Sequence, residues 1–138
     1  MNALPLSLAV TQSATLGVAL LVALSGGIGA MARALVIHHV GVRRSDPLPL
    51  GTVVVNASGS LLLGLLTGFS LYHGFGPKDL SVFGVGLCGG YTTWSTASWE
   101  SVHLARSGHR REAVVYTLGG LVVCLAAAAA GLAVAFAL

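Results

Sequence analysis

Four long stretches of this sequence carry no Asp, Glu, Lys or Arg, and they constrain the fold more than any other feature. They cover residues 1–32, 47–77, 80–99 and 113–138. Each reaches the length of about 20 residues that a helix needs to cross a hydrocarbon core of ~30 Å. Charged residues make up only 8% of the chain and hydrophobic ones 55%, whereas soluble domains are roughly one-quarter charged. The sequence therefore predicts an all-α integral membrane protein.

We expect one domain, residues 1–138, with four membrane-spanning helices near residues 14–37, 51–73, 80–104 and 113–136. The N-terminus lacks a basic segment and a small-residue cleavage pattern, so the first apolar run is interpreted as a retained helix and not as a signal peptide. A four-helix bundle of this length can scarcely enclose a pore of its own. Function is therefore expected to need an oligomer.

The basic residues lie in the short loops between the expected spans. Loops one and three carry five arginines and loop two carries one lysine, namely Arg43, Arg44, Arg106, Arg110 and Arg111 against Lys78. Because Lys and Arg concentrate on the cytoplasmic side, we interpret them as topology signals and not as a nucleic-acid surface. We predict a multi-pass protein of the cell membrane, with loops one and three in the cytoplasm and both termini outside.

An enzyme is not expected. The short loops leave no room for a soluble catalytic domain, and no set of nucleophile, base and orienting group is present. Cys88 and Cys124 both fall inside expected spans, where cysteines usually behave as small apolar residues.

The second expected span has a small or polar residue at every fourth position, which places these residues on one helix face. They are Thr52, Asn56, Ser60, Gly64 and Gly68. The glycines match the small-xxx-small spacing of packed membrane helices. An amide at mid-membrane depth needs a partner or water, so Asn56 either joins two helices or lines an aqueous path.

Two further polar residues leave similar alternatives open. Arg33 follows GGIGAMA at the end of the first expected span and is either a topology anchor or a cation that attracts anions into a vestibule. Tyr116, near the start of the fourth span, is either an interfacial aromatic residue or a functional hydroxyl.

The third expected span contains an unusual polar run, CGGYTTWSTASWE, at residues 88–100. Two glycines followed by two β-branched threonines predict a helix break. Broken backbone at membrane depth must be buried in protein or line a cavity, and its freed carbonyls suit a hard cation such as Na⁺. The hydroxyls of Ser95 and Thr96 and the positive ring edge or indole N–H of Trp94 suit an anion. Glu100 is expected in a water-filled vestibule.

Three ordered motifs make the chain resemble the Fluc (CrcB) fluoride ion channels of microbes. They are GGIGAMAR in the first span, GTVVVNASGS in the second and GGYTTWST followed by Glu100 in the third. The resemblance implies a fluoride-selective channel that exports fluoride passively and protects against fluoride toxicity. It also implies an antiparallel dimer with two pores and a structural Na⁺ at the central interface.

The resemblance further implies roles for individual residues. The backbone carbonyls of Gly89 and Thr92 would hold Na⁺. The residues carried over to the pore and its vestibules are Asn56, Trp94, Ser95, Thr96, Tyr116, Arg33 and Glu100.

The chain departs from the family pattern at several positions. Trp94 and Ala97 stand where the family has phenylalanines, and Gly120 and Cys124 stand where hydroxyls are expected. An antiparallel homodimer should also have a small Lys/Arg bias, unlike the five-to-one bias here. We therefore hypothesise a heterodimer whose homologous partner supplies the missing aromatic residues, with the homodimer as the alternative.

Two other classes compete with a channel. A small multidrug exporter would need a buried acid in its first span, and this chain has none there. A non-transporting assembly subunit would explain the small-residue faces, but neither the predicted break nor Asn56.

Overall fold

The computed structural model describes the backbone of residues 6–42 and 48–138 and the side chains of residues 15–40 and 48–138. All regular elements in these ranges are helical. Three helices are long: α1 (Leu6–Val42), α2 (Leu50–Tyr72) and α6 (Arg110–Ala137). Between α2 and α6 come four short segments: α3 (Pro77–Leu80), η1 (Ser81–Cys88), α4 (Gly89–Tyr91) and α5 (Trp94–Arg106).

The three long helices contain segments that are long and apolar enough to cross a membrane. These segments are Thr15–Val40, Leu50–Tyr72 and Arg110–Ala137. They correspond to the first, second and fourth predicted spans, although α1 begins before residue 14 and continues past residue 37. A multi-pass membrane protein is therefore confirmed at this level.

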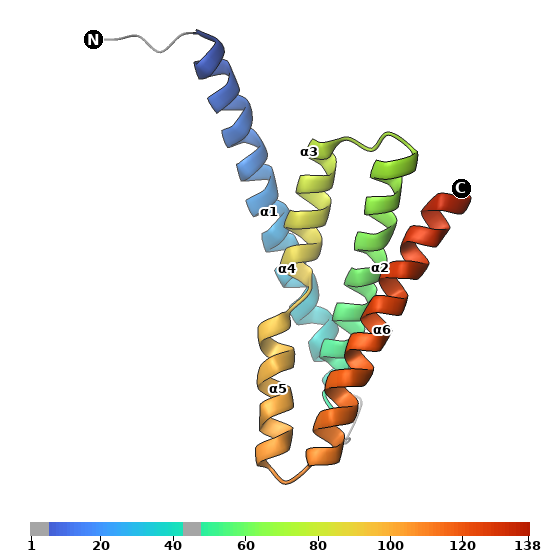
Figure 1. Ribbon diagram of the computed structural model, residues 1–138. Coiled ribbons are helices and arrows are strands. Elements are labelled where there is room, and N and C mark those ends of the chain that lie inside the picture. Colours follow the sequence, from blue (N-terminus) through green and yellow to red (C-terminus); the bar gives the residue numbers. More distant parts are fainter. Residues whose placement is uncertain (1–5, 43–47) are drawn as a thin grey trace.

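The third predicted span is interrupted. Figure 1 shows α3, α4 and α5 following one another along one path beside α2, with a change of direction before α5. Together the four segments run from residue 77 to residue 106 and include the expected range 80–104. Each is too short to cross a membrane alone.

Segment η1 is π-helical, which the sequence analysis did not predict. The Ser25 hydroxyl of α1 donates a hydrogen bond to the backbone oxygen of Val82, at 2.7 Å. A side chain that inserts into a helical ladder is one of the recognised causes of local distortion. The π-helical turn thus lies where α1 contacts the broken helix.

Helices α2 and α6 pack together along their length through small residues. A side chain at Gly64 would strike the backbone of Ala128, and one at Gly68 would strike Ala135. On the other helix, a side chain at Gly131 would strike the backbone of Leu61. The predicted packing role of Gly64 and Gly68 is therefore confirmed.

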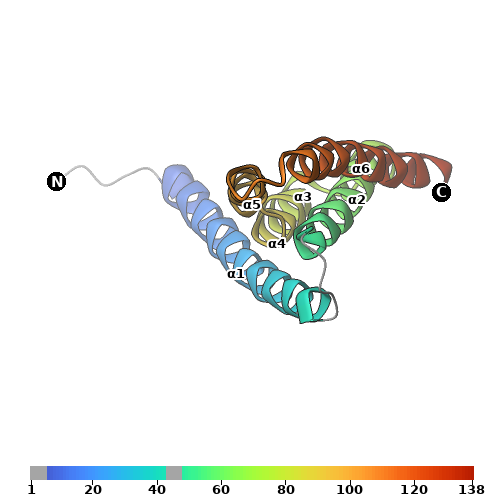
Figure 2. The same cartoon turned by 90° about the horizontal axis from the view of Figure 1, so that it is seen from below.

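Helix α1 makes an equally close contact with η1 and α4. A side chain at Gly90 would strike the backbone of Gly26, and one at Gly29 would strike the backbone of Leu87. Viewed from below, α1 lies on one flank and α6 on the other, with α2 and the broken helix between them (Figure 2). Segments η1 and α4 therefore contact both α1 and α2.

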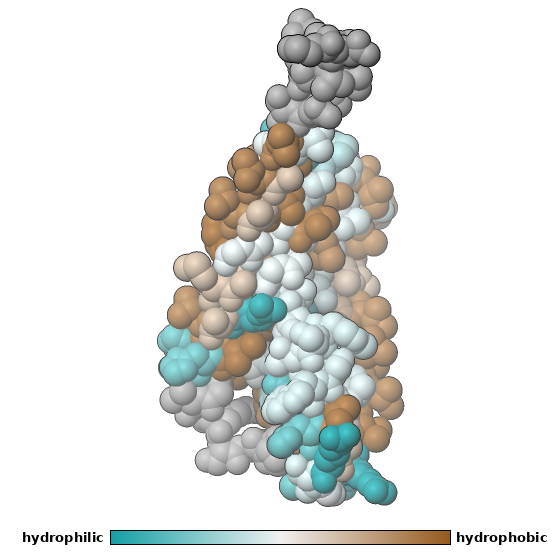
Figure 3. All heavy atoms as spheres, turned by 90° about the vertical axis from the view of Figure 1, so that its left-hand side faces the viewer, coloured by the Kyte–Doolittle hydropathy of each residue, from teal (hydrophilic) through white to brown (hydrophobic). Residues whose placement is uncertain are grey.

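In Figure 1, α1 and the broken helix run downward, and α2 and α6 run upward. The turn between α5 and α6 therefore lies at the lower end and the turn between α2 and α3 at the upper end. Arg106, Arg110 and Arg111 lie at or beside the lower turn, and Lys78 lies beside the upper one. Arg43 and Arg44 fall outside the described residues. Figure 3 shows apolar residues over the upper part of one face and polar residues at its lower end.

Candidate functional site

The backbone of the broken helix leaves the helical conformation at Thr92 and Thr93. Thr92 has φ −77° and ψ 162°, and Thr93 has φ −149° and ψ 121°, so both residues are extended. A break in this run was expected, but the glycine pair itself stays helical in α4. Gly90 is needed for the close contact with α1 instead, because any side chain there would meet the backbone of Gly26.

Asn56 holds the break in place from α2. Its Nδ2 donates to the backbone oxygen of Thr93 at 2.8 Å, and its Oδ1 accepts from the backbone N–H of Thr93 at 2.7 Å. These two bonds replace the helical partners that an interrupted backbone loses, as buried peptide groups require. Of the two alternatives for Asn56, the structure shows a bond between helices. Asn56 also lines the pocket described below, and the aqueous path stays a prediction.

Arg33 reaches the same break from α1. Its Nη1 donates to the backbone oxygen of Thr92 at 3.1 Å. Helix α1 continues from Arg33 to Val42, which is about 14 Å of further helix at 1.5 Å per residue. Arg33 therefore does not anchor the end of α1, and its guanidinium lies at the depth of the break.

Thr93 also starts α5. Its Oγ1 accepts from the backbone N–H of Thr96 at 3.2 Å, which is an ordinary N-cap arrangement. The same oxygen lies 3.0 Å from the Thr96 hydroxyl and 3.3 Å from that of Ser95. The two hydroxyls predicted to face an anion are thus engaged with the cap.

Glu100 lies one turn beyond Thr96 on α5, on the same helix face. Its Oε1 accepts from the Thr52 hydroxyl at 3.1 Å and its Oε2 from the Tyr116 hydroxyl at 2.6 Å. Tyr116 is only 6% exposed. Among residues 15–40 and 48–138, no cation pairs with this carboxylate. The structure therefore joins Glu100, Tyr116 and α2 through neutral hydroxyl donors.

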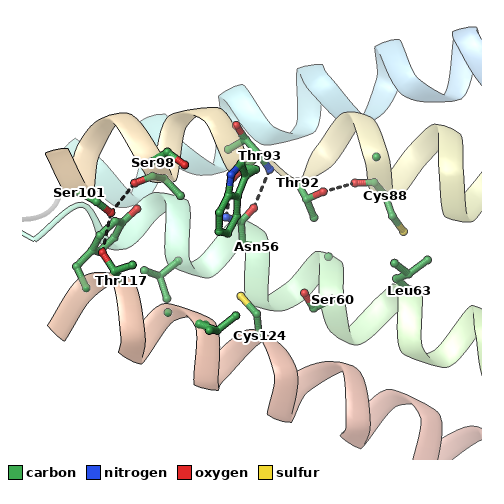
Figure 4. Close-up of a pocket in the computed structure, with 18 of the residues that line it drawn as sticks. Asn56, Ser60, Leu63, Cys88, Thr92, Thr93, Ser98, Ser101, Thr117 and Cys124 are labelled. Atoms are coloured by element: carbon green, nitrogen blue, oxygen red, sulfur yellow. Dashed lines mark hydrogen bonds between the residues drawn. The ribbon is translucent and has the colours of Figure 1, made fainter. Parts of the chain in front are cut away.

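A pocket of about 570 Å³ opens beside the break, between α2, η1, α5 and α6 (Figure 4). Predicted site residues in its lining are Asn56, Gly89, Thr92, Trp94 and Tyr116. Arg33, Ser95, Thr96 and Glu100 do not line it. The structure thus gathers part of the predicted set around one cavity. It places Arg33, Ser95 and Thr96 at the break and its cap, and Glu100 between Thr52 and Tyr116.

The pocket also contains residues that the sequence analysis did not assign to a site. They are Ser98 and Ser101 of α5, Thr117 of α6 and Ser60 of α2. The hydroxyl of Thr117 lies 2.8 Å from that of Ser101. On α5 the lining residues are Trp94, Ala97, Ser98 and Ser101, a spacing of three, four and seven that defines one helix face. That spacing was available in the sequence, but only α2 and α6 show which face is enclosed.

The carbonyls predicted to hold Na⁺ differ in their surroundings. In a continuous helix the Thr93 N–H would bond to the oxygen of Gly89, but it donates to Asn56 instead. The Gly89 oxygen is therefore released from the ladder at the C-terminal end of α4. The Thr92 oxygen accepts from Arg33, which leaves it one further lone pair.

The fold and the pocket together define a class: a multi-pass membrane protein with a broken helix and a polar site inside an apolar bundle. The family model described as "CrcB-like protein, Camphor Resistance (CrcB)" matches residues 20–132. The chain therefore belongs to the CrcB family.

Curated relatives agree with this assignment. A protein of Leifsonia xyli subsp. xyli named Fluoride-specific ion channel FluC 1 is 43% identical over 115 residues, covering 83% of this chain and 84% of the relative. A protein of Cutibacterium acnes named Fluoride-specific ion channel FluC 2 is 45% identical over 113 residues, covering 81% and 92%. A Nitrobacter winogradskyi protein named Fluoride-specific ion channel FluC is 37% identical over 114 residues, covering 82% and 90%.

Proposed function

We propose that this chain is a subunit of a fluoride-selective ion channel that lets fluoride leave the cell passively and so protects against its toxicity. The names of the relatives support the choice of fluoride. The observation that carries the proposal is the Asn56 amide at the break: one N–H is bonded to Thr93, and a side-chain amide has a second. That second donor is available to an anion in the pocket. Because the family's relatives are named ion channels, the chain is not an enzyme.

The proposed channel is a dimer with four spans per subunit, in which segments α3 to α5 together form the third span. Trp94 lines the pocket yet is 79% exposed. Tryptophan normally lies at the membrane interface, where its polar N–H reaches water. An exposed indole beside a mid-helix break needs cover, and a second, antiparallel subunit would supply it and close the open side of the pocket.

A structural Na⁺ at the dimer centre is part of the proposal. The released oxygen of Gly89 and the remaining lone pair of the Thr92 oxygen are hard carbonyl donors, which suit this cation. When bound, the ion would join the two subunits by sharing their carbonyls. Arg33 would be its positively charged neighbour, so the Gly89 oxygen is the better donor of the two.

The predicted orientation also belongs to the proposal. The end of the bundle that carries Arg106, Arg110 and Arg111 would face the cytoplasm. The charge bias, together with Ala97 in the pocket lining, supports a heterodimer in which a homologous partner supplies an aromatic contact. The homodimer is the alternative, and the same experiment separates the two.

The test is fluoride efflux from liposomes that contain the purified chain alone, followed with a fluoride electrode and with chloride as the control ion. Fast, fluoride-selective efflux would establish a homodimeric channel and refute the heterodimer. If folded protein gives no efflux, the homologous partner is added to the liposomes. Absence of fluoride efflux in both preparations would refute the proposed function.

A further inference from the structure

Several hydroxyl side chains of this protein bond to the helical backbone one turn earlier. The hydroxyls of Ser58, Thr67, Ser81, Ser101 and Thr117 each donate to the backbone oxygen four residues earlier, at 2.7–2.8 Å. This is the usual way for Ser and Thr to satisfy their hydrogen in an apolar environment. Such hydroxyls are not free to bind a ligand.

Ser60 and Ser98 behave differently. Both line the pocket, and neither hydroxyl has a hydrogen-bond partner among residues 15–40 and 48–138. A hydroxyl in an apolar environment is more stable with a hydrogen-bond partner. Their partner is therefore expected inside the pocket.

The two serines lie on either side of Asn56. Figure 4 shows Ser98 and Ser60 displaced in opposite directions from Asn56 along the pocket. Ser98 comes from α5 and Ser60 from α2, one turn beyond Asn56. Three donors from two helices thus follow the length of one cavity.

The facing helix α6 offers no hydroxyl at the corresponding level. Gly64 of α2 packs against Ala128 of α6, and the two helices run in the same direction. Four residues earlier on each helix stand Ser60 and Cys124, which therefore lie at one level, and both line the pocket. A thiol is a weak donor compared with a hydroxyl.

We propose that Ser60 and Ser98 donate hydrogen bonds to the anion in this pocket, Ser60 on one side of Asn56 and Ser98 on the other. The inference rests on the proposed function and specifies two donors of the path. A compact halide such as fluoride accepts hydrogen bonds from small hydroxyls that can rotate toward it.

The experiment measures fluoride efflux from liposomes for Ser60→Ala, Ser98→Ala and the wild type, reconstituted in the form that conducts. A hydrogen bond to a charged group is strong enough that each change should slow efflux about tenfold. Ser81→Ala is the matched control, because its hydroxyl bonds to Pro77 and lies outside the pocket lining. Its efflux should equal that of the wild type.

Two further variants separate a lost donor from a packing defect. Ser60→Thr keeps the hydroxyl and should conduct near the wild-type rate, whereas Ser60→Ala should conduct about tenfold more slowly. In the Ser60→Ala background, Cys124→Ser returns a hydroxyl from α6 and should restore most of the efflux.

Wild-type rates in both Ser→Ala variants, or equal slowing by Ser60→Thr and Ser60→Ala, would overturn the inference and leave the channel function standing. A wild-type protein that passes no fluoride, alone or with its partner, would overturn both.

Discussion

Replacing Asn56 with alanine should destabilise the protein by removing both hydrogen bonds that hold the break. The N–H and the C=O of Thr93 would each lose a partner at distances of 2.7 and 2.8 Å, and Thr93 is only 6% exposed. A buried polar group without a partner costs about 1–3 kcal/mol, so the two together cost about 2–6 kcal/mol. Water in the adjoining pocket can replace one bond, which favours the lower half of this range.

The assay is denaturant unfolding of the purified protein in detergent, followed by loss of helical signal. Thr67→Val is the matched control on the same helix, because its hydroxyl bonds only to the backbone of Leu63. The free energy of unfolding of this control should fall by less than about 1.5 kcal/mol, the upper end of the usual net contribution of one hydrogen bond. If Asn56→Ala lowers the free energy of unfolding no more than this control does, the break does not depend on Asn56.

Three other substitutions test separate parts of the structure. Gly64→Leu should lower the free energy of unfolding by ~3 kcal/mol, the upper end of the usual cost of overpacking, because the side chain would meet the α6 backbone. Gly119→Leu, where an added Cβ meets nothing, should unfold like the wild type, and equal losses would contradict the packing of α2 on α6. Gly89→Leu should leave the subunit folded but monomeric by size-exclusion chromatography, since this position is open within the chain, and an intact dimer that retains Na⁺ would argue against the ion site. Arg33→Met removes a charged donor from the Thr92 oxygen and should cost about 1.5–3 kcal/mol in the same unfolding assay; no loss would mean that this bond is not formed in the membrane protein.

Much of the fold follows from the sequence because membranes restrict the backbone severely. Without water in the hydrocarbon, every peptide group must be bonded internally, so a long apolar run has to be helical. Charge-free runs therefore located α1, α2 and α6, and the glycines at Gly64 and Gly68 identified the face that packs on α6. The run at residues 88–100 likewise predicted a break, since its helix propensity is poor.

The exact place of the break depended on tertiary contacts. Helix propensity favoured the glycines, but Gly90 stays helical because α1 approaches its backbone there. Thr93 leaves the helix because Asn56, 37 positions earlier in the chain, offers both a donor and an acceptor to its peptide groups. The π-helical turn at Ser81–Cys88 likewise lies against α1, whose Ser25 hydroxyl bonds to the backbone oxygen of Val82.

The candidate site, like the fold, depends partly on the sequence alone and partly on tertiary contacts. The sequence by itself determined which residue types are available: an amide, hydroxyls, an indole, a carboxylate and a guanidinium within or beside apolar helices. Only the tertiary structure decided which of them share the pocket, because that depends on which helix faces meet. It turned Ser98 and Ser60 toward the cavity and bonded Ser95 and Thr96 to the cap, although all four are hydroxyls of similar reach.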